Sequence, residues 1–304
     1  MIWYSGYNNY KKHELLLDYH GPNIHRFKTE LTEFSYRNMS NIHDVFYEEL
    51  AQRQTKYVEV LYSGGMDSET VIRSCMISKI PVRALTAKFM INGYPINTHD
   101  LYHSERFCRL NDIEQVFVEL DVKKFFENGD HVSYIKPYHI WQSHIATHFW
   151  IFEQATGFPV FGGEYSWPWV DKPIISPHKL IFMCYDRFLS DRGIHGIGSM
   201  LGNSLDSNML FIKHHIETMK QEHIVIDNSN ITTFKRRLFK NMGFGDLEPR
   251  MKYYGWDNLD RDILDIHYYT DKLIEDYGFS HAEIKWNNMI ANILGGEPGT
   301  NDKH

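Results

Sequence analysis

The chain has 304 residues, of which 42% are apolar and 15% aromatic, enough for one large or two modest globular domains. Its 32 basic and 39 acidic side chains give a net charge of −7, which argues against wholesale electrostatic binding of nucleic acid. The three cysteines form no C-x-x-C pair, so neither a zinc ribbon nor a redox pair is expected. Because there is neither a membrane-length apolar run nor a signal-peptide layout, we expect a cytoplasmic protein without a membrane partner.

Residues 1–56 are expected to be a lead-in that packs on the core. The aromatic-rich residues 1–8 favour a strand, and residues 42–54 have the apolar spacing of a helix. The apolar residues that would share one face of this helix are Ile42, Val45, Phe46 and Leu50.

Residues 57–165 alternate between strand and helix signals, which is typical of a parallel sheet covered by helices on both faces. The strands are expected at 57–62, 81–89, 115–120 and 158–161, and the helices at 69–79, 98–110 and 138–156. The sequence therefore predicts a doubly wound α/β domain. Ligands bind such sheets at the carboxyl ends of the strands, where Ser63, Thr86, Lys88 and Gly162 would lie.

Residues 166–304 differ, because strand signals become few after the apolar run at 180–184. We expect a mainly helical, substrate-side region that ends in a mobile tail at 295–304. Its helices are expected at 205–219, 232–241, 260–277 and 281–293.

The hexapeptide Ser63-Gly64-Gly65-Met66-Asp67-Ser68 stands between the first predicted strand and the first predicted helix. Unpaired backbone N–H groups and the helix dipole favour an anion at a helix N-terminus, and two glycines let the backbone approach it closely. Asp67 would repel a phosphate unless Mg²⁺ lay between them, bound by one or two carboxylates and phosphate oxygens. The hexapeptide is no Walker A loop, since no Lys follows the glycines.

The hexapeptide resembles the SGGxDS loop of the PP-loop, or N-type, ATP pyrophosphatase superfamily. This superfamily includes asparagine synthetases, argininosuccinate synthetases, NAD synthetases, 7-cyano-7-deazaguanine synthases, tRNA thiolation enzymes and sulfate-adenylyl reductases. All but the last split ATP between its α and β phosphates while activating an acceptor oxygen. The resemblance implies ATP and Mg²⁺ as cofactors, with the hexapeptide, Thr86, Lys88, Gly162 and Gly163 at the nucleotide and Asp67 as both a catalytic residue and a metal ligand.

Gly162-Gly163-Glu164 ends the last predicted strand. In asparagine-synthetase-like members of the superfamily, a Gly-rich turn with an acidic residue stands here, contacts the phosphates and supplies a second Mg²⁺ ligand. The resemblance assigns this metal role to Glu164, with Asp171 as a second choice, while a plain turn with a solvated Glu is the alternative. The aromatic run Tyr165, Trp167 and Trp169 would be either a substrate-stacking wall or core.

The basic, amphipathic stretch 233–240 and the segment 250–255 offer cations for the charge on departing pyrophosphate. Several superfamily members use a C-terminal Lys or Arg in this way, and Lys240 and Arg250 are the candidates named here. A solvated helix face and an RNA-contacting patch are the alternatives. The pairs His99/His103 and His144/His148 have the i, i+4 spacing of metal ligands, but hydrogen-bonded histidines are the commoner explanation.

These features favour an ATP-dependent, AMP-forming ligase that adenylates a carboxylate or carbonyl oxygen and passes the activated group to an amine or ammonia. The acceptor would be a small molecule or a nucleobase. Glutamine hydrolysis in this family needs a Cys directly after the first Met, and Ile2 stands there, so nitrogen would come as free ammonia, from another amine or from a separate subunit. A thiolation-type tRNA or nucleobase enzyme and a non-catalytic nucleotide-binding module are the alternatives.

Overall fold

The computed structural model describes residues 2–5, 14–19, 25–30, 42–51, 57–138, 145–163, 181–200, 210–211, 214–215, 217–218, 221 and 231–248. Several sequence predictions lie outside these residues and stay predictions. They are the helices at 260–277 and 281–293, the tail at 295–304, and the roles of Glu164, Tyr165, Trp167, Trp169, Asp171 and Arg250.

The N-terminal part contains a small antiparallel sheet and one helix. The sheet consists of β1 (Ile2–Ser5), β2 (Glu14–Tyr19) and β3 (His25–Glu30), paired in that order. The helix, α1 (Ile42–Ala51), buries all four apolar residues that its spacing places on one face. The predicted strand and helix are therefore confirmed, whereas β2 and β3 occupy a stretch for which no element was predicted.

The central sheet is built from parallel strands, as predicted. Its strands are β4 (Val58–Leu61), β5 (Val82–Ile91), β6 (Tyr94–Pro95), β7 (Glu114–Asp121) and β8 (Phe158–Phe161). β4 pairs in parallel with both β5 and β8, and β7 pairs in parallel with β5. The parallel strands thus run in the order β7-β5-β4-β8, and the short β6 pairs antiparallel with the end of β5.

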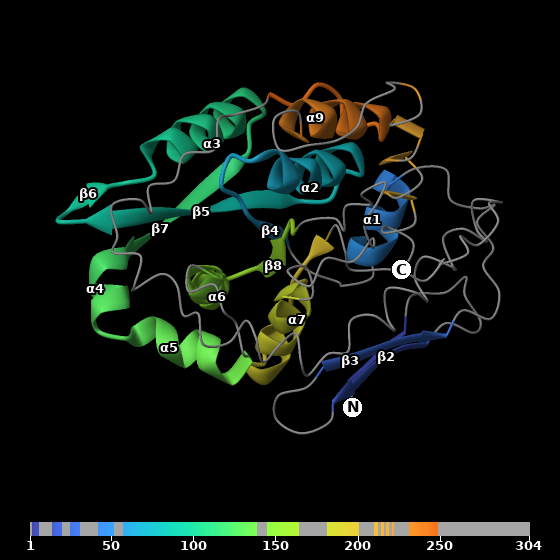
Figure 1. Ribbon diagram of the computed structural model, residues 1–304. Helices are drawn as coiled ribbons and strands as arrows, with labels where there is room; N and C mark the ends of the chain where they lie inside the picture. The colour runs from blue at the N-terminus through green and yellow to red at the C-terminus, as the bar shows by residue number, and fades with distance from the viewer. Residues whose placement is uncertain are drawn as a thin grey trace, which may run out of the picture.

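Helices cover both faces of this sheet, which confirms the doubly wound α/β fold (Figure 1). One face carries α2 (Met66–Ile77), α3 (Thr98–Leu110) and α9 (Ile231–Asn241), and the other carries α4 (Val122–Glu127), α5 (Asp130–Ile135), α6 (Ile145–Gln154) and α7 (Ile181–Asp191). Successive residues of a strand point to opposite faces, so Val60 of β4 packs in the cluster of α2 and Leu61 packs in the cluster of α6.

Two of the sequence predictions need correction. The apolar run at 180–184 carries the last strand signal in the sequence, but α7 begins at Ile181, and its later residues Tyr185, Phe188 and Leu189 bury one helical face. Phe188 stacks on Phe149 of α6 with ring centroids 4.3 Å apart. A short apolar run alone does not distinguish a strand from a buried helix. In addition, Tyr138 ends a 3-10 turn rather than starting the long helix expected at 138–156.

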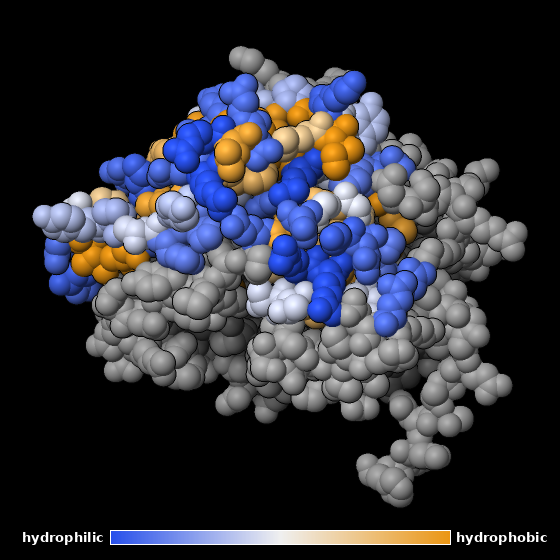
Figure 2. Space-filling model, turned by 90° about the horizontal axis from the view of Figure 1, so that it is seen from above, coloured by the Kyte–Doolittle hydropathy of each residue, from blue (hydrophilic) through white to orange (hydrophobic). Residues whose placement is uncertain are grey.

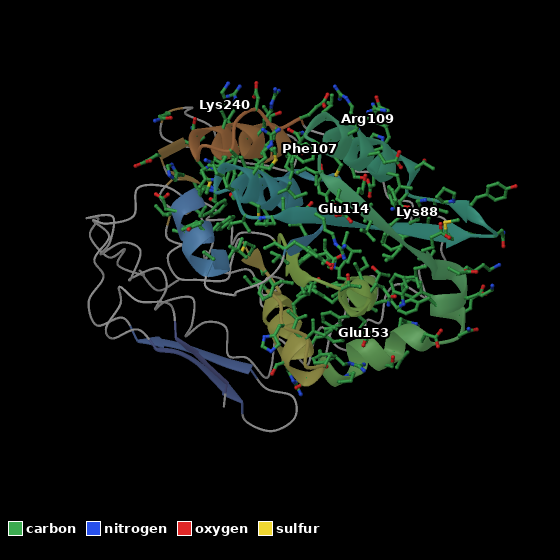
Figure 3. The ribbon with its side chains drawn as sticks, turned by 180° about the vertical axis from the view of Figure 1, so that it is seen from behind. Lys88, Phe107, Arg109, Glu114, Glu153 and Lys240 are labelled. Atoms are coloured by element: carbon green, nitrogen blue, oxygen red, sulfur yellow. The ribbon has the colours of Figure 1, made fainter. Side chains whose placement is uncertain are left out.

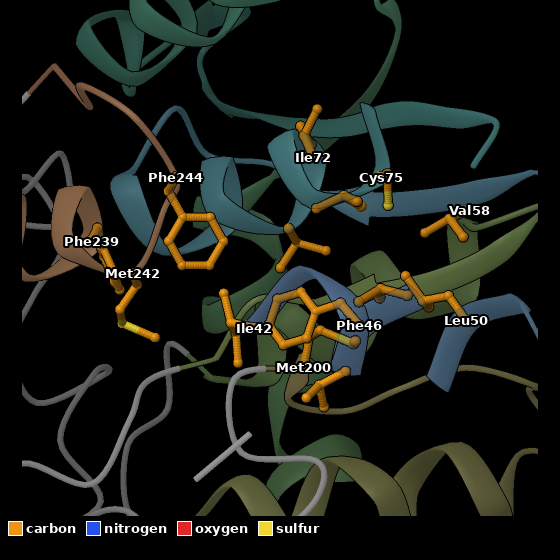
Figure 4. Close-up of a cluster of buried hydrophobic side chains, with 14 of the residues drawn as sticks. Ile42, Phe46, Leu50, Val58, Ile72, Cys75, Met200, Phe239, Met242 and Phe244 are labelled. Atoms are coloured by element: carbon orange, nitrogen blue, oxygen red, sulfur yellow. The ribbon is translucent and has the colours of Figure 1, made fainter. Parts of the chain in front are cut away.

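A hydrophobic cluster joins α1, α2 and the chain after α9 (Figure 4). Ile42 and Phe46 of α1 are fully buried against Ile72 and Cys75 of α2, and Phe244 is 2% exposed in the same cluster. Full burial of each such side chain contributes roughly 1.5–3 kcal/mol. This cluster fixes α2, whose N-terminus carries Asp67, relative to the segment that follows α9.

Candidate functional site

The turn after β4 and the turn after β8 meet at the point where the strand order reverses. β4 leads through α2 to β5 on one side, whereas β8 is reached through α6 on the opposite face. A Cβ built on Gly162 would lie 3.0 Å from backbone atoms of Asp67 and Ser68. In an open α/β sheet, this reversal is where a ligand binds outside the carboxyl ends of the strands.

The hexapeptide at 63–68 forms a tight turn whose shape depends on Gly64. Gly64 has φ +76°, and a Cβ there would lie 2.8 Å from the Asp100 carbonyl oxygen and 3.0 Å from the Ser104 nitrogen of α3. Gly65 is extended and precedes the first residue of α2. The Ser68 hydroxyl donates to the Gly65 carbonyl at 3.2 Å. The loop is therefore pressed between α3 and the turn after β8, and α2 starts from it with its N-terminal N–H groups available to an anion.

Hydrogen bonds across three strands hold the residue before the loop. The Thr86 hydroxyl of β5 donates to the Tyr62 carbonyl at 2.9 Å. Gln115 of β7 in turn donates to the Thr86 hydroxyl at 2.9 Å and to the Ser104 hydroxyl of α3 at 3.0 Å. Thr86 is 1% exposed, and its hydroxyl fixes the end of β4 through the bond to Tyr62.

A cation from α9 reaches the loop. The Lys235 ammonium donates to Asp67 Oδ2 and forms an ion pair with it, although 168 residues separate the two in sequence. The Lys235 and Asp67 side chains are 15% and 26% exposed, so both stay within reach of a ligand from solvent. The loop thus offers backbone N–H groups, a carboxylate and a lysine in one place.

Among the other predicted site residues, Lys240 and Lys88 lie near carboxylates other than Asp67, Gly163 directly follows Gly162, and the rest lie outside the described residues. Lys240 is exposed on α9, 3.9 Å from Asp246, and Lys88 lies 3.8 Å from Glu119 on the neighbouring β7. Figure 3 shows Lys240 and Lys88 at well-separated places. Gly163 has φ +73°, and a Cβ there would meet the Ser199 hydroxyl. The structure therefore brings the hexapeptide and Gly162 together and adds Lys235, which was not singled out from the basic stretch.

The spacing in α9 distinguishes Lys235 from Lys240. Phe234, Leu238 and Phe239 form the buried stripe of the helix, and the Lys235 ammonium lies 5.7 Å from the centre of the Phe239 ring. Lys235 precedes Phe239 by four residues and so borders the buried stripe, whereas Lys240 falls on the exposed side. This periodicity separates Lys235 from Lys240 in the sequence, but it does not select Lys235 as the partner of Asp67.

One buried carboxylate near the loop, Glu69, forms an ion pair with an arginine of the same helix. Glu69 of α2 accepts from Arg73 Nε at 2.8 Å, and burial raises the pKa of its carboxyl group while Arg73 opposes that rise. Glu69 is 6% exposed. Asp67 is therefore the carboxylate of α2 that is open to a bound ligand.

Of the two histidine pairs, His99/His103 lies within the described residues, whereas His144 of the second pair lies outside them. The His99 and His103 rings lie 4.7 Å apart, and His148 Nδ1 hydrogen-bonds the Tyr185 hydroxyl at 2.7 Å. Among the residues that the structure describes, no group of three or more His, Cys, Asp or Glu residues is arranged to hold a metal ion.

Two of the cysteines are unsuited to thiolate chemistry. Cys75 and Cys108 are 0% and 2% exposed, and burial raises the pKa of each thiol to about 12. Both thiols are therefore protonated at neutral pH, and protonated thiols are poor nucleophiles.

The surface above α2, α3 and α9 is mainly hydrophilic, with small groups of hydrophobic residues between the polar ones (Figure 2). Basic side chains on this side have acidic neighbours: Arg106 lies 2.5 Å from Glu248, and Arg236 lies 3.3 Å from Asp246. None of the described helices combines the length and the apolar character that a membrane span requires.

Comparisons with known proteins give structural matches. No family model and no curated protein matches the chain. An NH3-dependent NAD synthetase from Campylobacter jejuni matches at 16% identity and a TM-score of 0.31, over 69% of this chain and 96% of its own. An NMN synthetase from Francisella tularensis matches at 9% identity and a TM-score of 0.31, over 69% of this chain and 95% of its own. A predicted subunit of a tRNA methyltransferase from Methanocaldococcus jannaschii matches at 17% identity and a TM-score of 0.29, over 46% of this chain and 65% of its own.

At such identities and TM-scores the matches carry no inference about activity. The site is interpreted from the loop, its neighbours and its place in the sheet.

Proposed function

We propose that the chain is an ATP-dependent, AMP-forming ligase that binds the triphosphate of ATP at the hexapeptide 63–68. The observation that supports this most is the contact between Lys235 and Asp67 at the N-terminus of α2. A phosphate site needs N–H donors and a cation, and a carboxylate beside them is explained by a phosphate-bound metal ion.

Each group has a defined part in this reaction. The N–H groups at the start of α2 bind phosphate oxygens. Gly64 and Gly162 allow the loop to pack closely on α3 and on the turn after β8, because a Cβ at either position would meet backbone. Lys235 neutralises the charge that develops on pyrophosphate as it leaves. The acceptor oxygen attacks the α-phosphorus, the bond to the β-phosphate oxygen breaks, and a nucleophile then displaces AMP from the acceptor.

Asp67 fits one carboxylate ligand of a Mg²⁺ ion that keeps most of its coordination as phosphate oxygens and water. It stands in the first turn of α2, partly exposed and next to the proposed phosphate groups. Mg²⁺ bound there would withdraw charge from the phosphates. The second carboxylate, proposed as Glu164, lies outside the described residues.

The acceptor is proposed to be a small molecule or a nucleobase, with ammonia, another amine or a separate subunit as the nitrogen source. The thiolation alternative is less well supported, because Cys75 and Cys108 are buried with raised thiol pKa values. A non-catalytic nucleotide-binding module would need the glycines but gives no reason for the carboxylate.

Two lysines of α9 provide a matched test of the proposed reaction. We expect Lys235→Ala to lower pyrophosphate release from Mg²⁺–ATP by roughly 100-fold, the usual loss for one charge-stabilising group. Lys240→Ala removes an equally charged residue from the exposed side of the same helix, so it should change the rate by less than about 2-fold. Equal rates for the two variants would contradict the role of Lys235.

A further inference from the structure

The segment Gly243–Glu248, which we call the return segment, folds back from the end of α9 onto three helices. His43 of α1 hydrogen-bonds the Gly243 carbonyl at 3.1 Å. Arg106 of α3 lies 2.5 Å from Glu248 at the other end of the segment. Phe244 is buried between these points, with its ring centre 5.7 Å from that of Phe239. The return segment therefore attaches α9 to the helices of the nucleotide loop.

Arg73 of α2 makes the central contact with the return segment. Its Nη1 donates to the Phe244 carbonyl at 3.1 Å and its Nη2 donates to the Asp246 carbonyl at 3.2 Å. Its Nε donates to Glu69 at 2.8 Å, which fixes the guanidinium on its own helix. The planar guanidinium holds these donors in a rigid arrangement, so one side chain ties two carbonyls to α2.

Arg73 and Asp67 belong to the same helix, and each contacts the α9 region. Six residues separate them, which corresponds to about 9 Å along an α-helix. Asp67 binds Lys235 on α9, while Arg73 binds the return segment that begins two residues after α9 ends. The two contacts together fix the position and direction of α9. Without Arg73, the polar attachment of α9 to α2 would rest on the Lys235 ammonium, whose side chain is flexible.

We propose that Arg73 is a positioning residue, which holds α9 against α2 so that Lys235 stays at Asp67 and at the phosphates that this site would bind. This inference rests on the proposed role of Lys235. It adds that the geometry of the site depends on a guanidinium that hydrogen-bonds Glu69 and the return segment and lies over the ring of Phe107.

A double-mutant cycle tests whether Arg73 acts through Lys235. We expect Arg73→Met to lower pyrophosphate release by roughly 10- to 100-fold, as displacement of a catalytic group by about an ångström does. In the Lys235→Ala background, the same substitution should change the rate by less than about 2-fold, because the group that it positions is already gone. Fold-changes that multiply would overturn the proposal. Arg73→Lys should recover part of the loss. Arg109 is an exposed arginine on α3, so Arg109→Met serves as the control.

Hydrogen exchange provides a measurement that does not depend on activity. In Arg73→Met, exchange should become faster at amides of 231–248 and stay unchanged in β4 and β5. Unchanged exchange at 231–248 would overturn the proposal. If Lys235→Ala leaves pyrophosphate release unaltered, the proposed function fails, and the exchange pattern still decides whether Arg73 holds α9.

Arg73→Met leaves the buried Glu69 without its cation, and such a change alone can unfold a domain. The pair Glu69→Gln with Arg73→Met removes both charges and is compared with Glu69→Gln alone. Calorimetry with Mg²⁺–pyrophosphate then measures the site directly. We expect binding at least about 10-fold weaker in the pair than in Glu69→Gln, and equal affinities would contradict the proposal.

Discussion

Replacing Gly64 with alanine has a matched control in this chain, because Gly129 has the same φ in open surroundings. Both glycines have φ +76°. An alanine at this φ costs roughly 1–2 kcal/mol at either position. A Cβ on Gly129 meets nothing within 4 Å, whereas one on Gly64 lies 2.8 Å from the Asp100 carbonyl oxygen and 3.1 Å from His103 Cβ.

The contacts at Gly64 add a second term that Gly129 lacks. Overpacking of this kind costs roughly 1–3 kcal/mol, since backbone of α3 or of the loop must move. We therefore expect Gly129→Ala to lower the free energy of unfolding by about 1–2 kcal/mol and Gly64→Ala by about 2–5 kcal/mol. Only Gly64→Ala should also weaken Mg²⁺–ATP binding, because the loop that moves is the one proposed to hold the phosphates.

Urea denaturation and calorimetry with Mg²⁺–ATP measure these two quantities on the same preparations. The slope of the urea transition should stay constant, so that its midpoint reports stability. If the two variants lost the same stability and bound ATP equally well, the close packing of the loop on α3 would not be what shapes the site.

Three further substitutions test separate parts of the account. Asp67→Asn should keep the fold, as judged by an unchanged circular dichroism spectrum, and abolish turnover; an unchanged rate would remove Asp67 from the mechanism. Arg83→Met should lower the free energy of unfolding by about 3 kcal/mol, because Glu59 is fully buried and loses its cation. The Arg83–Glu59 pair lies at the amino ends of β4 and β5, away from the proposed ATP site at their carboxyl ends. Weakened ATP binding in this variant would therefore contradict the placement of the site. Burial lowers the pKa of His43 from its usual 6.5, against the opposing effects of the Gly243 carbonyl and Asp44. As pH falls below 6.5, the unfolded state therefore binds more protons than the folded state. The stability that neutral His43 contributes is thus present above pH 6.5 and is lost as pH falls further below it. The difference in melting temperature between wild type and His43→Gln should shrink from about pH 8 to about pH 5, and a constant difference would refute this sign.

Local patterns predicted much of the nucleotide domain. The strand, glycine turn and helix around Ser63 are short-range features, so the order of residues specifies them directly. The same holds for α3, which spans the predicted residues Thr98–Leu110, and for β8 at Phe158–Phe161. The strand signal at 180–184 did not reveal α7, because apolar residues fit both a strand and a buried helix, and contacts with α6 decide between them.

The pairing of residues distant in sequence could not be predicted in the same way. Lys235 was one of several cations in a basic stretch, and only the packing of α9 on α2 selects it. Thr86 was placed at the ligand edge from its position on β5, yet its hydroxyl bridges Tyr62 and Gln115. In both cases, side chains from other elements determine what a residue contacts.

The central claim concerns which bond of ATP is broken, and product analysis tests it most directly. The purified chain is incubated with Mg²⁺ and ATP labelled at the α-phosphate, across a panel of amino acids, nucleobases and tRNA, and the labelled nucleotides are separated. We expect labelled AMP together with pyrophosphate, stimulated by one class of acceptor. Labelled ADP would contradict the proposed reaction, because it would mean that the bond between the β and γ phosphates is the one that breaks.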